Sequence, residues 1–530
     1  MSEEKEIDSP RGESVSSSEQ DLPAVRGPIP YKVTLVQGIY FLERAAFYGL
    51  SQPLQNYLQL SPNDPLRPGA IGLGEARAVL IIYFWFIYSY TTPMVGGLLA
   101  DCWLGRRKTI QIGFLIYILG LSIVTGTAFS QRIYGTGGLP GFIVGMFLVG
   151  AGTGTVKPNI TVFLVDQLPE EEPKVVTLKN GKSALQKRDL TIRFIWNVNY
   201  WMINVGGLCG IITTNVERYA YAGFGFAFMI CLCFIVAAAV IFQVGYFKFE
   251  TAPPSGNAIA NLFSALRHRR HPDHHNPAQT EVASQSSSQE DGPATPSKDE
   301  AIIAEAKSAL RACLVFLPFP ALLLSINLMD STLIAQAGTM QTHGIPNDIM
   351  YNLNPISVMV FLPLFQSWIY PTLEKRKINF SAEHRIGVGL FCAALAIGYT
   401  TGIQDLIYNT GPCFNHPLKC AGPTVPNDVN IGVQTPTYVF LAWAEILAIV
   451  SGTELAYSRA PTSMKSIVQA LFSLFSAFGS VLGVGVSFAA YDPNMVIVYG
   501  SITALLFFVS VAFELNYFVR DKRSSRKASS

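Results

Sequence analysis

Long apolar runs alternate with short polar segments along most of the chain. Each run has about 20 residues, the length that an α-helix needs to cross the ~30 Å apolar core of a bilayer. The runs lie at 33–57, 79–100, 110–129, 140–165, 195–215, 222–247, 308–335, 352–372, 385–404, 436–457, 466–488 and 493–518. The pattern therefore predicts an all-α membrane protein of about twelve transmembrane helices, six on each side of a polar insert.

The composition supports this prediction. Half of the 530 residues are hydrophobic and only 14% are charged, whereas soluble domains carry about 25% charged residues. The net charge of +2 says little about partners. The first 30 residues are polar and lack the apolar core of a cleavable signal peptide, so we expect none.

The polar segments divide the chain into five regions. We predict a disordered cytosolic tail at 1–32, an N-terminal six-helix bundle at 33–248, a flexible cytosolic linker at 249–306, a C-terminal six-helix bundle at 307–518 and a basic cytosolic tail at 519–530. The linker is rich in Ser, Pro, His and charge, so it cannot bury a core. Basic residues follow the even-numbered runs, and the positive-inside rule then places both termini in the cytosol.

Two adjacent charges, Glu43 and Arg44, interrupt the first apolar run. They lie about ten residues into it, or ~15 Å at 1.5 Å per residue, which is near the membrane midplane. On a helix they share one stripe with Tyr40, Phe47 and Tyr48. A charge at this depth costs about 2.5–3.5 kcal/mol, so we expect the pair to face protein or water. The alternative is a terminal pair that reaches the head groups.

A third charge, Lys157, lies at similar depth in the fourth run. A buried lysine is costly unless an acid pairs with it, and Glu43 is the natural partner. The alternative is a purely structural ion pair between two helices. Glycines at 150, 152 and 154 allow neighbouring helices to approach closely.

The tenth run contains two acids, Glu445 near the midplane and Glu454 nine residues later. Nine residues turn an ideal helix by about 180°, so the two acids share a cavity only if the helix bends, and Gly452 is a candidate for the bend. We predict that Glu445 is a ligand and that Glu454 is an inner gate or a structural acid.

Polar groups at the ends of other runs have two interpretations each. Asp101, Arg106 and Arg107 follow the second run and predict a charged latch between helices; the alternative is a basic loop that only sets topology. Asn204 in the fifth run binds either a ligand or a neighbouring helix.

Two cysteines, Cys413 and Cys420, bracket a short loop that the topology places outside. An oxidising exterior permits a disulfide between them; the alternative is two unpaired thiols. The sequence has no nucleotide-binding loop, haem ligand pair, nucleophile elbow or metal-ligand cluster. We therefore expect no enzyme activity, no cofactor and no metal.

Five motifs together resemble the proton-coupled oligopeptide transporter family of the major facilitator superfamily, in its fungal branch. They are GLLADCWLGRRK (97–108), GTGTVKPNITVFLVDQ (152–167), NYWMINVGGL (199–208), MDSTLIAQAGTMQTHGIPNDIMYNLNPI (329–356) and GTELAYSRAPTSMKS (452–466). The resemblance covers about 33–518. It implies two six-helix bundles and proton-coupled uptake of di- or tripeptides by alternating access. The implied partners are a small peptide, protons and the bilayer, with no nucleic acid, and the implied location is the plasma membrane.

The resemblance also implies a role for each site residue. Arg44 and Lys157 would hold the peptide carboxylate, and Glu445 would hold its amino group. Glu43 and Glu445 would couple transport to protons. The pocket lining would include Tyr48, Tyr90 and Asn204.

The chain departs from the family pattern at two acids. Tyr40 stands where the family carries the first glutamate of its first-helix motif, and in the seventh run Asp330 is offset from the usual acid. Two alternatives therefore stay open. One is the same fold with another cargo, such as nitrate or a specialised metabolite, including export. The other is a nutrient-sensing receptor that transports little.

Overall fold

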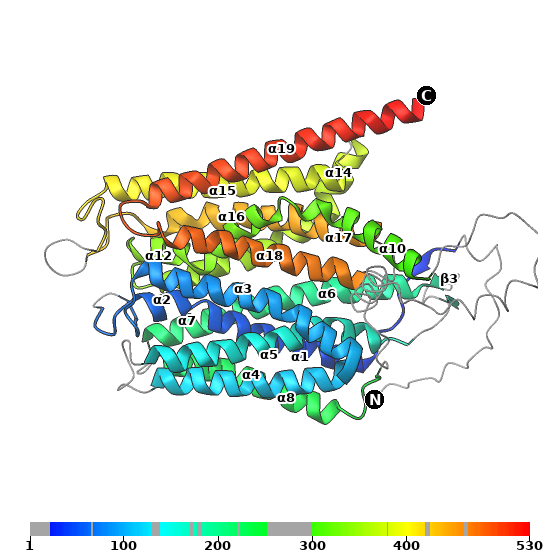
Figure 1. Cartoon of the computed structure of the whole chain (residues 1–530), viewed down its shortest axis with the longest axis horizontal. Coiled ribbons are helices and arrows are strands. Elements are labelled where there is room, and N and C mark those ends of the chain that lie inside the picture. Colours follow the sequence, from blue (N-terminus) through cyan, green and yellow to red (C-terminus); the bar gives the residue numbers. More distant parts are fainter. Residues whose placement is uncertain are drawn as a thin grey trace, which may run out of the picture.

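The computed structural model describes most of the chain. The described residues are 22–64, 67–129, 138–169, 173–177, 183–219, 223–251, 298–378, 380–418, 425–460 and 465–529. Nearly all of them are helical, and the helices lie side by side in an elongated bundle (Figure 1).

In its described residues, the N-terminal half contains eight α-helices and one π-helical segment. They are α1 (Tyr31–Ser51), α2 (Leu54–Gln59), α3 (Glu75–Leu99), the π-helix η1 (Ala100–Leu104), α4 (Arg106–Phe129), α5 (Leu139–Asp166), α6 (Arg188–Leu208), α7 (Gly210–Tyr219) and α8 (Gly223–Gly245). The first and fifth predicted spans are each built from two helices, α1 with α2 and α6 with α7.

Helices of the C-terminal half are more often broken. They are α10 (Lys298–Ala312), η5 (Cys313–Phe316), α11 (Phe319–Asn327), η6 (Leu328–Asp330), α12 (Thr332–Gly338), η7 (Asn347–Asn352), α13 (Leu353–Leu364), η8 (Phe365–Ile369), α14 (Tyr370–Lys375), α15 (Ala382–Asn409), η9 (Ile431–Gln434), α16 (Thr435–Ala444), η10 (Glu445–Val450), α17 (Ser451–Arg459), α18 (Lys465–Ser487) and α19 (Met495–Ser529).

The described residues include ten helices that are long and apolar enough to cross a membrane. Two further helical segments, α1 and α6–α7, occupy the first and fifth predicted spans and contain the polar motifs of those spans. The predicted all-α architecture of about twelve spans is therefore confirmed.

Three of the predicted region boundaries need correction. Ala24–Val25 forms the strand β1, which pairs with β3 (Ser183–Gln186), and β3 pairs in turn with β2 (Lys174–Thr177). The predicted tail at 1–32 is therefore ordered from about residue 22, because backbone pairing fixes it. The helix α10 begins inside the predicted linker, and α19 continues through the predicted tail at 519–530 to Ser529. Residues 1–21 and 252–297 lie outside the described part of the chain.

Close helix packing in the N-terminal half depends on glycines. A Cβ atom at Gly96 would lie 2.4 Å from the carbonyl oxygen of Gly154, and one at Gly154 would lie 2.2 Å from Oγ1 of Thr92. These distances leave no room for a side chain, so α3 and α5 cross with their backbones in contact. The predicted use of Gly154 for close helix approach is confirmed, and the crossing brings α5 against the centre of the bundle.

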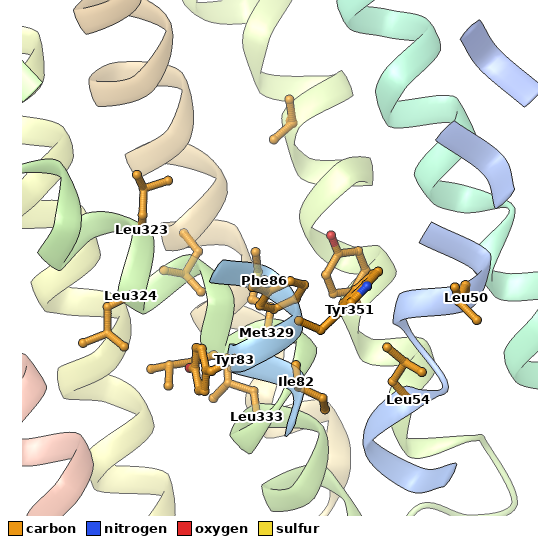
Figure 2. Close-up of a cluster of buried hydrophobic side chains, with 14 of the residues drawn as sticks. Leu50, Leu54, Ile82, Tyr83, Phe86, Leu323, Leu324, Met329, Leu333 and Tyr351 are labelled. Atoms are coloured by element: carbon orange, nitrogen blue, oxygen red, sulfur yellow. The ribbon is translucent and has the colours of Figure 1, made fainter. Parts of the chain in front are cut away.

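The two halves meet mainly where α3 packs against α18 and α6 against α13. Figure 2 shows an apolar cluster to which both halves contribute. Its labelled members are Leu50, Leu54, Ile82, Tyr83 and Phe86 from the N-terminal half and Leu323, Leu324, Met329, Leu333 and Tyr351 from the C-terminal half. A Cβ atom at Gly483 of α18 would lie 2.2 Å from the Tyr83 ring, so this glycine lets the halves close.

The bundle has two different ends. We call the end where α1 begins and α19 ends the terminal end, and the end where α2, α12 and η7 lie the loop end (Figure 1). Hydrogen bonds between the halves join Gln52 to Asn352 and Asn56 to Asn347 at the loop end. The loop end is therefore closed in this structure.

Candidate functional site

Glu43 and Arg44 form a bidentate ion pair in the middle of α1. Nε and Nη2 of Arg44 each donate to a different Glu43 carboxylate oxygen, both at 2.6 Å. Thr153 on α5 completes the arrangement: its hydroxyl donates to Glu43 at 2.9 Å and accepts from Arg44 at 3.2 Å. Glu43 is 0% and Arg44 1% exposed, so each charge is compensated within protein, as the sequence predicted.

Aromatic rings surround the guanidinium group. Its carbon lies 5.5 Å from the ring centre of Tyr40, 4.9 Å from Phe47 and 5.9 Å from Tyr48. Cations are attracted to ring faces at such distances, more strongly where water is excluded. The predicted stripe on α1 is thus confirmed. Tyr40, at the position of a missing acid, is part of the cation's environment.

Lys157 does not pair with Glu43 as predicted. The Glu43 carboxylate is occupied by Arg44 and Thr153, and Lys157 forms no ion pair with an acid in the described ranges. It lies one turn beyond Thr153 on α5 and is half-buried. Arg44 pairs with the Glu43 carboxylate in preference to Lys157, because a guanidinium group presents two parallel donors to the two oxygens and an ammonium group does not. Lys157 therefore has an ammonium group available to an anionic ligand.

Glu445 lies at the first residue of a π-helical segment, η10. Its carboxylate accepts a hydrogen bond of 3.2 Å from the side-chain amide of Asn354 on α13. The sequence made Gly452 a candidate for a bend in this helix. The π-helical segment lies before it, at Glu445–Val450, and a bend at Gly452 stays a prediction. Gly452 makes room for Phe319, whose ring would lie 2.5 Å from a Cβ there. π-Helical turns occur often at functional sites, and this one starts at the candidate ligand.

Glu454 follows on α17, is exposed, and lies within electrostatic range of Tyr370. It belongs to the helical segment beyond η10, on the side of the terminal end. Its predicted role as an inner gate or structural acid stays a prediction.

Tyr48, Tyr90 and Asn204 come from three different elements of the N-terminal half and are half-buried. Tyr48 lies within electrostatic range of both Arg44 and Glu445. The Tyr90 hydroxyl reaches Asn327 on α11, at 3.5 Å, across the two halves. Asn204 donates to the Tyr200 carbonyl of its own helix at 2.9 Å. Among the described residues its amide oxygen has no hydrogen bond, which leaves the predicted alternatives of ligand or helix open.

Asp330 also faces the centre of the molecule. It lies beside Ser51, and its Oδ1 is buried without a hydrogen-bond partner in the described residues. Tyr48 is within its electrostatic range as well. Its offset position in the seventh span therefore still brings a carboxylate next to the residues of the predicted site.

Five residues at the centre of the molecule are only half-buried. Tyr48, Lys157, Asn204, Asp330 and Glu445 are partly accessible although they lie at membrane depth. The loop end is closed by buried side chains, so we expect water to reach these residues from the terminal end.

Ion pairs join residues of the predicted latch at the terminal end, and their role as a latch stays a prediction. Arg106 at the start of α4 lies 3.6 Å from Asp101 on η1 and 2.7 Å from Asp166 at the end of α5. Arg107 donates to the Tyr246 carbonyl at 3.0 Å and lies over its ring. Sequence reasoning missed Asp166, because its partner is 60 residues away; the terminal position of an acid in VFLVDQ was the only signal.

Cys413 takes part in a disulfide. The predicted partner, Cys420, lies outside the described residues, so the pairing stays a prediction. The described ranges contain no group of three His, Cys, Asp or Glu side chains that could hold a metal ion.

One family model matches most of the sequence. The model of the POT family matches residues 107–503. The chain belongs to the POT family. That match includes Lys157, Asn204 and Glu445, while Glu43 and Arg44 precede its first residue.

Relatives that align with nearly the whole chain support the assignment to the POT family. The probable peptide transporter ptr2 of Schizosaccharomyces pombe is 34% identical over 497 residues, which cover 93% of this chain and 78% of that protein. The peptide transporter PTR2 of Saccharomyces cerevisiae is 32% identical over 526 residues, which cover 97% and 82%.

Solved structures agree with the fold. The POT family transporter PepTSo superposes with a TM-score of 0.70 at 20% identity, covering 94% of this chain and 99% of that one. An auto-inhibited POT family peptide transporter gives 0.69 at 20%, covering 92% and 96%. The two six-helix bundles of the major facilitator superfamily are therefore the fold of this POT chain, which is an integral membrane protein.

Proposed function

We propose that this POT chain is a secondary active transporter that takes up di- and tripeptides together with protons by alternating access of its two halves. The observation that carries the proposal is the division of charge at the membrane midplane. The cations Arg44 and Lys157 come from the N-terminal half, and the acid Glu445 comes from the C-terminal half. The peptide transporters among its relatives support the same cargo.

A small peptide is a zwitterion, with a carboxylate at one end and an ammonium at the other. Lys157 and Arg44 bind the carboxylate, and Glu445, oriented by Asn354, binds the ammonium. A cargo held at both ends draws the halves together, which converts binding free energy into closure.

Proton coupling resides in the carboxylates of Glu43 and Glu445. Protonation of Glu43 removes its charge from the bidentate pair and releases the Arg44 guanidinium for a cargo carboxylate. Deprotonation on the other side restores the ion pair and expels the cargo. The direction of a proton gradient then sets the direction of transport.

The charge distribution supports a plasma-membrane protein with both termini in the cytosol. Basic residues gather at the terminal end, where Arg106 and Arg107 lie. By the positive-inside rule this end faces the cytosol. The loop end then faces outside, where the disulfide of Cys413 is permitted. The structure would be the state open to the cytosol.

The ammonium site can be tested by binding. Purified wild type should bind an unmodified dipeptide about tenfold or more tightly than the same dipeptide with an acetylated amino group, since a hydrogen bond to a charged group contributes about 1.5–3 kcal/mol. Glu445→Gln should abolish this preference, as measured by calorimetric titration.

Glu454→Gln is the matched control, because it changes an acid of the same span beyond η10, and it should keep the preference. Equal binding of both peptides by wild type would place the ammonium elsewhere. Failure of wild type to bind any dipeptide would point to another cargo on the same fold.

A further inference from the structure

Two buried acids face each other at the loop end, one from each half of the molecule. Glu217 lies near the end of α7, and Asp348 lies in η7. They are 3% and 0% exposed, and their carboxyl groups lie side by side. Neither belongs to the cargo site proposed above, which lies at the membrane midplane.

The contact between these acids is part of the closure of the loop end. Asn56 on α2 donates to Oε1 of Glu217 at 3.2 Å and exchanges two amide hydrogen bonds of 3.0 Å with Asn347, the neighbour of Asp348. The apolar cluster of Figure 2 lies closer to the midplane, since Leu50 and Leu54 precede Asn56 along the chain. An apolar layer and a buried polar layer thus separate the midplane from the loop end.

Three of the four carboxyl oxygens have no hydrogen-bond donor. Oε2 of Glu217 and both side-chain oxygens of Asp348 are buried without a partner in the described part of the chain. Ionised carboxylates have only acceptors, so their contact becomes a hydrogen bond only when one of them carries a proton. Two ionised carboxylates in one buried site repel each other, and such pairs share a proton.

The surrounding charges do not replace that proton. Arg67, from the loop before α3, donates to Asp64 at 3.2 Å and to the Gly338 carbonyl at 3.2 Å. Arg218 follows Glu217 on α7 and attracts both carboxylates electrostatically. This attraction is weaker than the cost of burying their charges. The other titratable groups on α2, α7 and η7 are the phenols of Tyr57, Tyr219 and Tyr351, and a phenol carries no positive charge.

We propose that Glu217 and Asp348 form a proton-binding site that holds the loop end closed. When the halves meet, one proton from the water at the loop end binds to one carboxylate and forms an O–H···O hydrogen bond with the other. When the halves separate, both carboxylates are hydrated, and the proton returns to that water. This inference rests on the proposed function only in that the halves separate at the loop end during the cycle.

The proposal gives acid a defined effect on conformation. A proton bound only in the closed state raises the closed-to-open ratio by up to about tenfold for each unit by which pH falls. The pair also supplies a titrating group outside the midplane in a chain that lacks the acid at Tyr40. Its proton controls the gate and need not travel with the cargo.

The test measures the separation of the halves without cargo or gradient. Spin labels are attached through genetically encoded amino acids at the exposed positions Asn63 and His343, one on each half, so that the native cysteines stay. Distances are recorded by pulsed electron paramagnetic resonance in lipid nanodiscs between about pH 5 and about pH 8, a range that brackets a perturbed carboxyl pair.

In wild type, the distance between the two spin labels should shift from short to long values as pH rises. Glu217→Gln and Asp348→Asn should each stay closed at both pH values, because an amide donates permanently to the remaining carboxylate. Asp428→Asn, at an exposed acid of the same end, should behave as wild type.

A wild type with no pH response would overturn the proposal, and so would a response that persists unchanged in Glu217→Gln or in Asp348→Asn. The two single variants are independent, so misfolding of one leaves the other decisive. Because cargo is absent, a failure of peptide uptake does not alter this result.

Discussion

Replacing Lys157 by alanine is expected to abolish gradient-driven uptake while the protein still folds and inserts. In the structure its half-buried ammonium group is not engaged by any described acid, since Arg44 holds Glu43. The variant therefore breaks no ion pair, and the loss falls on cargo binding. Uptake of labelled dipeptide into proteoliposomes should fall at least about a hundredfold, as expected when a charge-assisted hydrogen bond of about 3 kcal/mol is lost.

Lys108→Ala is the matched control, because Lys108 is an exposed lysine at the terminal end. It should retain uptake close to that of wild type. Elution as a single species from a sizing column and an unchanged thermal midpoint would show that Lys157→Ala is folded. Full uptake by Lys157→Ala would remove this residue from the site.

Removing Arg44 alone should destabilise the folded protein more than removing both charges of the pair. Arg44→Ala leaves the Glu43 carboxylate, 0% exposed, without its two donors at 2.6 Å. Breaking a buried pair by deleting one partner costs about 3–5 kcal/mol. The thermal midpoint in detergent should therefore fall by several degrees.

The double variant Glu43→Gln/Arg44→Met removes both charges and tests the cause of the loss. Because a neutral, well-packed pair has no unpaired charge, the double variant should be more stable than Arg44→Ala alone. If the two variants are equally unstable, lost packing against Tyr40, Phe47 and Tyr48 explains the effect and the ion pair does not.

The sequence predicts most of the fold, because bilayer thickness fixes the length of each apolar run. The runs correspond to helices or chains of helices, and charges at midplane depth identify the centre of the molecule. Glu43, Arg44, Lys157 and Glu445 all stand out as costly residues in apolar surroundings. This signal is local and needs no knowledge of packing.

Contacts between distant residues are what the sequence alone does not predict. The choice of Arg44 over Lys157 as the partner of Glu43 depends on the geometry of two donors and on Thr153. The π-helical start at Glu445 depends on packing against neighbouring helices. Glu217 and Asp348 lie 131 positions apart in the sequence. Both are near helix ends, where an acid is usually expected to face water.

The paired strands β1 and β3 and the continuation of α19 beyond residue 518 were missed for a related reason. The strands are short and lie in polar surroundings, and the end of α19 is itself polar. Polar segments of this kind are typical of disorder as well as of ordered structure. Ala24 pairs with Leu185, which lies 161 positions later in the sequence. Only the folded structure therefore shows that the segment around Ala24 is ordered.

The central claim is that a proton gradient drives peptide uptake through a site divided between the two halves. The most direct measurement is the accumulation of a labelled dipeptide in proteoliposomes with an inward proton gradient, compared with no gradient and with the Glu43→Gln variant. We predict accumulation above the external concentration only for wild type with the gradient. Uptake that only equilibrates across the membrane with the gradient imposed, or equal accumulation by Glu43→Gln, would contradict the account.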